Sequence, residues 1–206
     1  MESEQVTARP LSTDALHWAR ILRNYREPNH GRSICEIGAT LVPFLGFWAL
    51  AWAAIHFGYW EVSPILWILT AGFLVRLFMI QHDCGHGAFF RRRRANDWIG
   101  RIIGVLTLTP YESWRRNHAQ HHAGTGNLDR RGIGDITTLS VREFRALSRW
   151  GRILYRGYRH PVVMFGIGPA YVFFLRQRLP DDLIRSKGQV WISAMASNLA
   201  SAVVVA

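Results

Sequence analysis

Residues 63–86 of the chain read SPILWILTAGFLVRLFMIQHDCGH and join an apolar segment to a pair of histidines. The segment is apolar as far as Ile80 except for Arg76, which is close enough to the far end to extend its long side chain to the interface. His82 and His86 follow, four residues apart, and residues with this spacing share one face of a helix. A membrane helix that continues past Ile80 therefore places both imidazole rings just above the bilayer surface, on one side.

A second apolar segment precedes this one. Residues 37–55 contain nineteen residues without a charge, and at about 1.5 Å per residue they span roughly the 30 Å hydrocarbon core of a bilayer. Pro43 lies inside this segment, where a membrane helix tolerates proline as a kink. Only a short turn separates the two segments, so we expect a transmembrane hairpin.

Arginines indicate the orientation of this hairpin. The connecting turn carries none, and the two outer flanks carry Arg9, Arg20, Arg23, Arg26, Arg32 and the run Arg91–Arg94. Positive charge accumulates on the cytoplasmic side of membrane proteins. The N-terminus and the histidine clusters are therefore expected in the cytoplasm, in a multi-pass protein of the bacterial inner membrane.

Three further stretches complete the expected architecture. The apolar residues 99–108 are too short to span and should lie at the interface, and residues 142–159 should form one or two basic amphipathic helices against anionic lipid. Residues 161–175 give a short third span, and residues 190–206 give a fourth, inside which the sequence stops. We expect an all-α integral membrane protein, one domain over residues 1–206, with about four transmembrane helices, the last truncated, and a cytoplasmic helical cap.

Composition excludes several other classes of protein. The chain has a net charge of +11 from basic residues that are almost all arginine, yet it contains no helix-turn-helix, zinc finger or aromatic RNA-binding motif, so nucleic acid is not an expected partner. The first 32 residues are polar and do not resemble a cleavable signal peptide. The two cysteines, Cys35 and Cys84, do not form a disulfide framework, which suits a reducing compartment.

A second histidine cluster reads HAQHH over residues 118–122. His118 is three residues from His121 and four from His122, so the three rings can point at one site on a helix. Together with His82 and His86 they make five imidazoles within 41 residues, a grouping that indicates metal ligation. The isolated histidines are interpreted as ordinary surface residues: His17, His30, His56 and His160.

Imidazole suits zinc, copper, iron or nickel, so the ligand type alone leaves the metal open. Three or four protein ligands suffice for one zinc ion, and five in two groups suggest two metal ions. The glutamate base of zinc peptidases is replaced by Asp83, which is too short for the same geometry. The Glu-x-x-His signature of ferritin-like di-iron bundles is absent near both clusters.

The motifs resemble those of the membrane fatty-acid desaturase family, most closely its delta-12/omega-6-like bacterial branch. The similar stretches are HDCGHGAFF at residues 82–90, LTLTPYESWR at 106–115, HAQHH at 118–122 and TGNLDRRGIGD at 125–135. The first and third of these resemble the first two histidine boxes of the family. The resemblance covers nearly the whole chain, including the order of its helices.

This resemblance implies a di-iron enzyme that uses O2 to remove two hydrogens from adjacent methylenes of a long acyl chain. Membrane lipid acyl chains would be the substrate, held in a tunnel lined by aromatic side chains, and an external donor, ferredoxin-like or similar, would supply electrons. The residues that would ligate the two irons are His82, His86, His118, His121 and His122. The candidates for carboxylates that orient these imidazoles are Asp83, Asp97, Asp129 and Asp135.

The chain also departs from the family pattern. The family carries a third box of the form His-x-x-His-His after its fourth membrane helix, whereas His160 is the only histidine after His122 here. We therefore expect a sequence truncated on its C-terminal side that is inactive alone. Two alternatives stay open: a fatty-acyl hydroxylase of the same superfamily, and a non-catalytic remnant or metal-binding module. The sequence specifies neither the double-bond position, the acyl carrier nor the oligomeric state.

Overall fold

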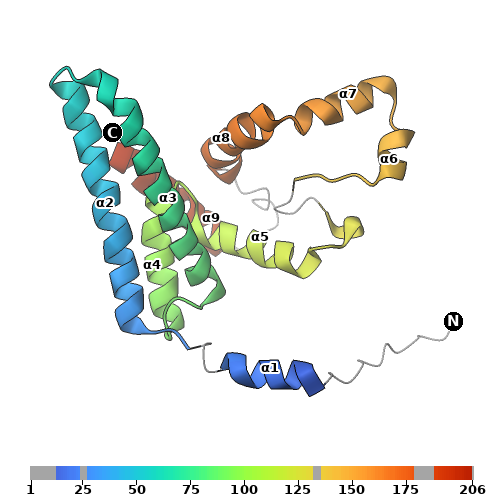
Figure 1. Cartoon of the computed structure of the whole chain (residues 1–206), viewed down its shortest axis with the longest axis horizontal. Coiled ribbons are helices and arrows are strands. Elements are labelled where there is room, and N and C mark those ends of the chain that lie inside the picture. Colours follow the sequence, from blue (N-terminus) through green and yellow to red (C-terminus); the bar gives the residue numbers. More distant parts are fainter. Residues whose placement is uncertain (1–12, 24–26, 132–135, 179–187, 206) are drawn as a thin grey trace.

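The architecture comes from a computed structural model that describes residues 13–23, 27–131, 136–178 and 188–205. Within these ranges the chain is helical and contains no strand (Figure 1). The longer helices are α1 (Thr13–Arg23), α2 (His30–His56), α3 (Ser63–His86), α4 (Arg93–Leu106), α5 (Tyr111–Gly124), α7 (Arg149–Tyr158) and α9 (Gly188–Val205). The all-α fold is as predicted.

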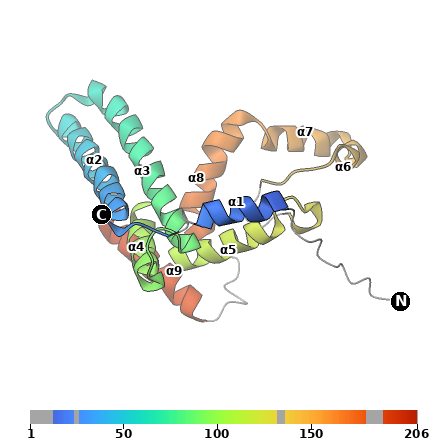
Figure 2. The ribbon, with the colours of Figure 1, turned by 60° about the horizontal axis from the view of Figure 1, so that its bottom comes forward.

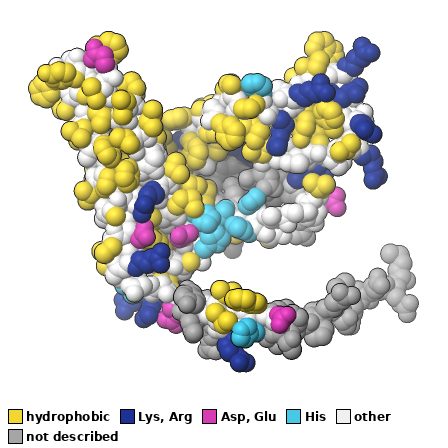
Figure 3. Space-filling model, in the orientation of Figure 1, with side chains coloured by type: hydrophobic (Ala, Val, Ile, Leu, Met, Phe, Trp, Pro, Cys, Tyr) yellow, Lys and Arg dark blue, Asp and Glu magenta, His cyan; other side chains and the backbone are white. Residues whose placement is uncertain are grey.

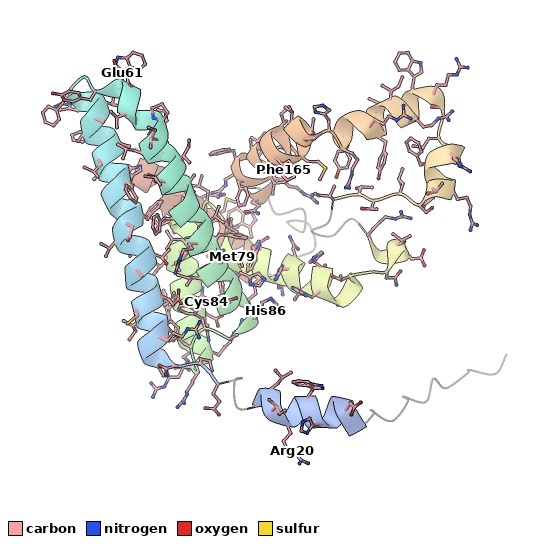
Figure 4. The ribbon with its side chains drawn as sticks, in the orientation of Figure 1. Arg20, Glu61, Met79, Cys84, His86 and Phe165 are labelled. Atoms are coloured by element: carbon pink, nitrogen blue, oxygen red, sulfur yellow. The ribbon has the colours of Figure 1, made fainter. Side chains whose placement is uncertain are left out.

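Helices α2 and α3 form the predicted hairpin. The side chain of Asn29 caps α2 by accepting a hydrogen bond from the Arg32 backbone N–H, and Pro64 occupies the first turn of α3. Both helices are long and apolar enough to cross a membrane. Their outward surfaces carry exposed large apolar side chains such as Trp48 and Ile68, as expected of helices that face lipid. Glu61 lies at the tip of the hairpin (Figure 4).

The charged side chain within the hairpin has a partner. The Arg76 guanidinium lies 2.9 Å from Glu36 Oε2, and its Nε donates to Thr40 Oγ1 at 3.2 Å. Arg76 was expected to extend its long side chain to the interface, and the structure adds contacts that tie α3 to α2. An ion pair at this position keeps the charge compensated near the end of the apolar segment.

Helix α4 packs against α3 and buries Gly100, Ile103 and Gly104. The absence of a side chain at Gly100 lets Tyr111 of α5 pack closely on α4, since a Cβ there would meet the Tyr111 ring at 2.2 Å. The charge of Arg101 on this helix is compensated by Glu112 of α5 at 2.6 Å. The expected position of residues 99–108 at the membrane interface remains a prediction.

The third apolar run is one continuous helical stretch over residues 161–174, shorter than α2 and α3. It contains a π-helical stretch, η3 (Val163–Ile167), that continues directly into α8 (Gly168–Phe174). Pro169 accounts for the π-helical stretch, because proline has no N–H and its ring crowds the carbonyl four residues earlier. Helices α2 and α3 are thus the two span-length candidates in the ranges that the structure covers, and the third and fourth spans remain predictions. Helix α9 packs on α4 and α5 (Figure 2), where Ser201 Oγ donates to the Val105 carbonyl at 3.2 Å.

The predicted basic helices are present as α6 (Val141–Ala146) and α7. Ser140 and Glu143 form a capping box at the start of α6, and Glu143 also pairs with Arg131. The hydroxyl of Tyr155 accepts a hydrogen bond from the Leu139 backbone N–H at 3.1 Å. This last contact attaches α7 to the segment that precedes α6. The proposed contact of both helices with anionic lipid remains a prediction.

Candidate metal centre

Four histidines meet where α3 and α5 cross. His82 and His86 occupy the last turn of α3, and His118 and His122 lie one turn apart on α5. Their candidate ligand atoms all lie within 4.8 Å of one another. Figure 3 shows the histidines as one patch between the two helices, and Figure 4 shows His86 at the end of α3 that faces α5.

The Nε2 atoms of these rings form a continuous series. His86 Nε2 lies 3.3 Å from His82 Nε2 and 3.1 Å from His118 Nε2. His118 Nε2 in turn lies 3.0 Å from His122 Nε2. The two central nitrogens therefore each have two nitrogen neighbours at contact distance.

Hydrogen bonding alone cannot account for this arrangement. An imidazole nitrogen offers either one proton or one lone pair in the ring plane, so it forms one good hydrogen bond and not two. A cation that faces all four lone pairs removes the conflict. Two imidazole nitrogens bound to one ion at 2.0–2.1 Å are about 2.9–3.4 Å apart for ligand angles near 90–110°, a range that includes the three consecutive Nε2 separations of 3.0–3.3 Å. The donor set fits a metal ion.

The protonation state of His118 favours ligation. The pKa of His118 is lowered to about 4, first because the ring is partly buried and second because the neighbouring imidazoles disfavour a further positive charge. His118 is therefore neutral at physiological pH. A neutral imidazole is the form that binds a metal.

His121, the fifth predicted ligand, lies apart from the group of four. Its ring centroid is 6.1 Å from that of His118 and 5.6 Å from that of His122. Successive residues of a helix are rotated by about 100°, so His121 and His122 cannot both face the same point. His121 lines a cavity of about 190 Å³ together with His118, Trp114, Arg176 and Gln177.

Only one of the predicted carboxylates contacts an imidazole in the described residues. Asp83 Oδ1 lies 3.1 Å from His82 Nδ1, so it can hold that ring with Nε2 directed at the cluster. Asp97 instead contacts Tyr111 and Arg93, and Asp129 follows the Asn127 cap on the surface. Asp135 lies outside the described residues.

Trp114 supports the cluster, and the sequence reading missed it. Its indole stacks on His118 with ring centroids 4.7 Å apart and an interplanar angle of 13°. The indole also occupies the space beside Gly85, where a Cβ would meet Trp114 Cζ3 at 2.7 Å. The spacing of four residues between Trp114 and His118 was the available signal, since such residues share a helix face.

Tyr111 joins the three helices behind the histidines. Its ring is fully buried, and its hydroxyl lies 3.0 Å from the Cys84 carbonyl and 3.1 Å from Asp97 Oδ1. Burial raises the pKa of Tyr111, and the nearby Asp97 carboxylate raises it further. The hydroxyl is therefore a permanent donor that connects the last turn of α3 to α4 and α5.

An apolar groove of about 380 Å³ lies beside the histidines. It is lined by Leu74, Val75 and Phe78 of α3, by residues 106–108, and by Pro169, Ala170, Phe173 and Phe174 of α8. Leu108 lines it from a left-handed backbone conformation with φ of 55°, which is uncommon for leucine. Leu74, Phe78 and His82 follow one another at intervals of four residues, so the groove runs along α3 toward the cluster.

Comparisons with known proteins show what the chain is similar to. A family model described as fatty acid desaturase matches residues 59–206. The chain is 42% identical over 166 residues to a fatty acid desaturase of Bacillus subtilis, which covers 81% of this chain and 47% of that protein. It is 38% identical over 103 residues to an sn-1 acyl-lipid omega-3 desaturase (ferredoxin) of Synechocystis, covering 50% of this chain and 28% of that protein.

A third relative is an sn-1 oleoyl-lipid 12-desaturase of Anabaena variabilis, 44% identical over 85 residues that make up 41% of this chain and 23% of that protein. The chain thus spans less than half the length of each of these relatives. No solved structure matches the chain.

Proposed function

The chain belongs to the fatty acid desaturase family, and from this premise we propose that the protein of which it is part introduces a cis double bond into long-chain acyl chains of membrane lipids. The reaction is O2-dependent and uses a di-iron centre. His82, His86, His118, His121 and His122 are the proposed ligands from this chain.

One observation carries the proposal: two Nε2 atoms, those of His86 and His118, each face two other Nε2 atoms at 3.0–3.3 Å. A cation between the rings would explain this arrangement, because each nitrogen can form only one good hydrogen bond. His121, one residue from His122, is the proposed contribution of α5 to a second iron. The adjoining cavity of about 190 Å³ provides room beside it.

Iron, when bound, supplies the O2 activation and oxidising power that an unactivated C–H bond requires, since no side chain acts as a base on an alkane. Two hydrogens leave adjacent methylenes, and with two electrons and two protons from outside they reduce O2 to two waters. The protein residues hold the ligands and the substrate in place. Asp83 and Trp114 orient His82 and His118 respectively.

The apolar groove is the proposed acyl site. Its walls are almost entirely apolar, and it runs along the face of α3 that leads to His82. An acyl chain that enters from the bilayer and lies on Leu74 and Phe78 is directed toward the histidines. Confinement in such a groove holds one pair of methylenes in a fixed position near the histidines, so the reaction does not depend on chance encounters with the rest of the acyl chain.

The proposed setting is a multi-pass protein with four spans whose N-terminus and histidines face the cytoplasm. Residues 1–206 form part of one desaturase domain in this proposal. An external donor delivers electrons from the cytoplasm, and ferredoxin is a reasonable class because the Synechocystis relative carries that word in its name. The arginines at 91–94 mark the cytoplasmic end of the hairpin.

Lipid profiling of a desaturase-deficient bacterial host tests the proposal. Expression of the protein that contains this chain should produce a new cis double bond, and His118→Ala and His121→Ala should each abolish it. His160→Ala, in a histidine outside both clusters, is the matched control and should retain the product. A hydroxylated acid without a new double bond would assign the protein to the hydroxylases. An unchanged unsaturated product in the His118→Ala and His121→Ala proteins would contradict the ligand assignment.

A further inference from the structure

Two cavities with opposite character lie on either side of one set of aromatic rings. The cavity beside His118 and His121 is lined largely by polar side chains and by Trp114. The groove proposed for the acyl chain is lined by Phe78 and Phe173. Helix α8 contributes to both, because Val172 lines the polar cavity while Phe173 lines the groove.

The three rings contact one another in series. Phe78 lies 5.5 Å from Trp114 at an interplanar angle of 75° and 6.1 Å from Phe173 at 84°. Both contacts are edge-to-face, which is a favourable geometry for aromatic pairs at these centroid distances. The series runs from α5 through α3 to α8, and all three side chains are partly buried.

The position of Phe78 along α3 places it on the path to the histidines. Leu74 lines the groove one helical turn before Phe78, and His82 follows one turn after it. Trp114, which forms the edge-to-face pair with Phe78, stacks on His118 and lies 6.0 Å from the ring of His82. The phenyl ring of Phe78 therefore stands between the groove and two of the clustered imidazoles.

We propose that Phe78, Trp114 and Phe173 form an aromatic barrier that limits how far an acyl chain advances from the groove toward the histidines. The barrier makes Phe78 and Phe173 specificity-determining residues, since the point at which the chain stops decides which of its methylenes come nearest to His82 and His118. This inference rests on the proposed function, because it takes the groove as the acyl site. Replacing one of these phenylalanines by alanine removes a whole aromatic ring, which is much larger than the single methylene by which a pocket can discriminate substrates.

Photo-crosslinking of the full 206-residue chain in lipid nanodiscs tests the barrier. The probe is a long-chain fatty acid with a diazirine near its methyl end, and the crosslinked peptides are identified by mass spectrometry. In the unsubstituted chain, crosslinks should fall on the groove residues of α3 and α8 and rarely on residues 113–118 of α5. In both Phe78→Ala and Phe173→Ala, the share of crosslinks on residues 113–118 should rise several-fold.

Phe174→Ala is the matched control. Phe174 also lines the groove from α8 but has no ring contact with Phe78 or Trp114 among the described residues, so its removal should leave the crosslink pattern unchanged. Retained metal binding by the four histidines reports that each variant folds. If Phe78→Ala fails this check, Phe173→Ala decides the question from the other helix.

The outcomes separate the two proposals. Groove crosslinks in the unsubstituted chain with an unchanged pattern in Phe78→Ala and Phe173→Ala would overturn the barrier and leave the acyl groove in place. An unsubstituted chain without groove crosslinks would overturn both the acyl groove and the barrier. A several-fold rise in Phe174→Ala as large as that in Phe173→Ala would also overturn the barrier, because it would show that any loss of groove volume has the same effect.

Discussion

The indole of Trp114 lies nearly parallel to the imidazole of His118, with the ring centroids 4.7 Å apart. This contact fixes the ring plane of the most connected histidine in the cluster, whose Nε2 contacts both His86 and His122. The orientation of the proposed metal ligand thus depends on an aromatic side chain one turn earlier on α5. The same indole packs against Gly85 where α5 crosses α3.

Replacement of Trp114 should weaken metal binding. Trp114→Ala removes the ring that orients His118, and loss of a partner that orients a ligand costs about 10–100-fold in metal affinity. Trp114→Phe keeps a flat ring and should retain most of the affinity. Competition titration with a chelator measures the change. Trp150→Ala, at an exposed tryptophan of α7, is the control, and equal affinities in Trp114→Ala and Trp150→Ala would contradict the orienting role.

Gly85→Ala should displace the indole. The added Cβ would meet Trp114 Cζ3 at 2.7 Å, and overpacking of this kind costs about 1–3 kcal/mol. Gly72→Ala is the matched control on the same helix, because nothing lies within 4 Å of its Cβ position; it should be neutral or stabilising by up to about 1 kcal/mol. Thermal unfolding in detergent compares the two, and equal midpoints would show that the α3–α5 crossing tolerates a methyl group.

Tyr111→Phe should loosen the last turn of α3. The substitution removes the hydroxyl between the Cys84 carbonyl and Asp97 while keeping the buried ring. The expected cost is about 0.5–1.5 kcal/mol, the net contribution of one hydrogen bond. Hydrogen exchange should rise at residues 84–87 in particular. Tyr171→Phe, at an exposed tyrosine, should leave hydrogen exchange at these residues unchanged. Unchanged exchange in Tyr111→Phe would show that the Tyr111 hydroxyl does not hold the last turn of α3.

Acid should weaken the contact between α4 and α5 by protonating Glu112, which pairs with Arg101. Partial burial alone would raise the pKa of Glu112, but hydrogen bonds from Arg101 and Arg115 outweigh it and lower the pKa below the ordinary 4.5. A carboxylate with a depressed folded-state pKa stabilises the fold above its unfolded pKa, and this contribution is lost as the pH falls below about 4.5. The unfolding midpoint should therefore drop in this window.

Glu112→Gln should remove most of that pH dependence, because the amide does not titrate. Glu61→Gln at the exposed hairpin tip should leave the acid-induced drop in the midpoint as it is. A Glu112→Gln protein with the same acid sensitivity as the unsubstituted chain would locate the effect in other carboxylates.

The local patterns of the sequence predicted the hairpin and the grouping of His82, His86, His118 and His122. Both depend on helix periodicity and on charge, which act over a few residues. Helix rotation separates His121 from His122, but which of the two faces His82 and His86 was not predicted, because it depends on how α5 lies against α3. Tertiary contacts such as the one between Gly85 and Trp114 set that placement.

The position of α4 shows the same limit. A short apolar run with an arginine is typical of an interfacial helix, and the sequence alone does not show that Gly100 receives the Tyr111 ring or that Arg101 meets Glu112. The third run was expected to span, although Gly168 and Pro169 lie inside it. Proline and glycine occur in many spanning helices, and the helix here continues through both residues, with a π-helical stretch before them that the sequence did not predict.

X-ray absorption at the iron edge of the iron-loaded chain in detergent tests the central claim, which is that His82, His86, His118 and His122 hold a common metal. Imidazole nitrogens should dominate the coordination shell. Their number should fall in His86→Ala and in His118→Ala, and should be unchanged in His160→Ala, whose histidine lies outside the cluster. Iron bound with the same imidazole signal in the double variant His86→Ala and His118→Ala as in the unsubstituted chain would contradict the account.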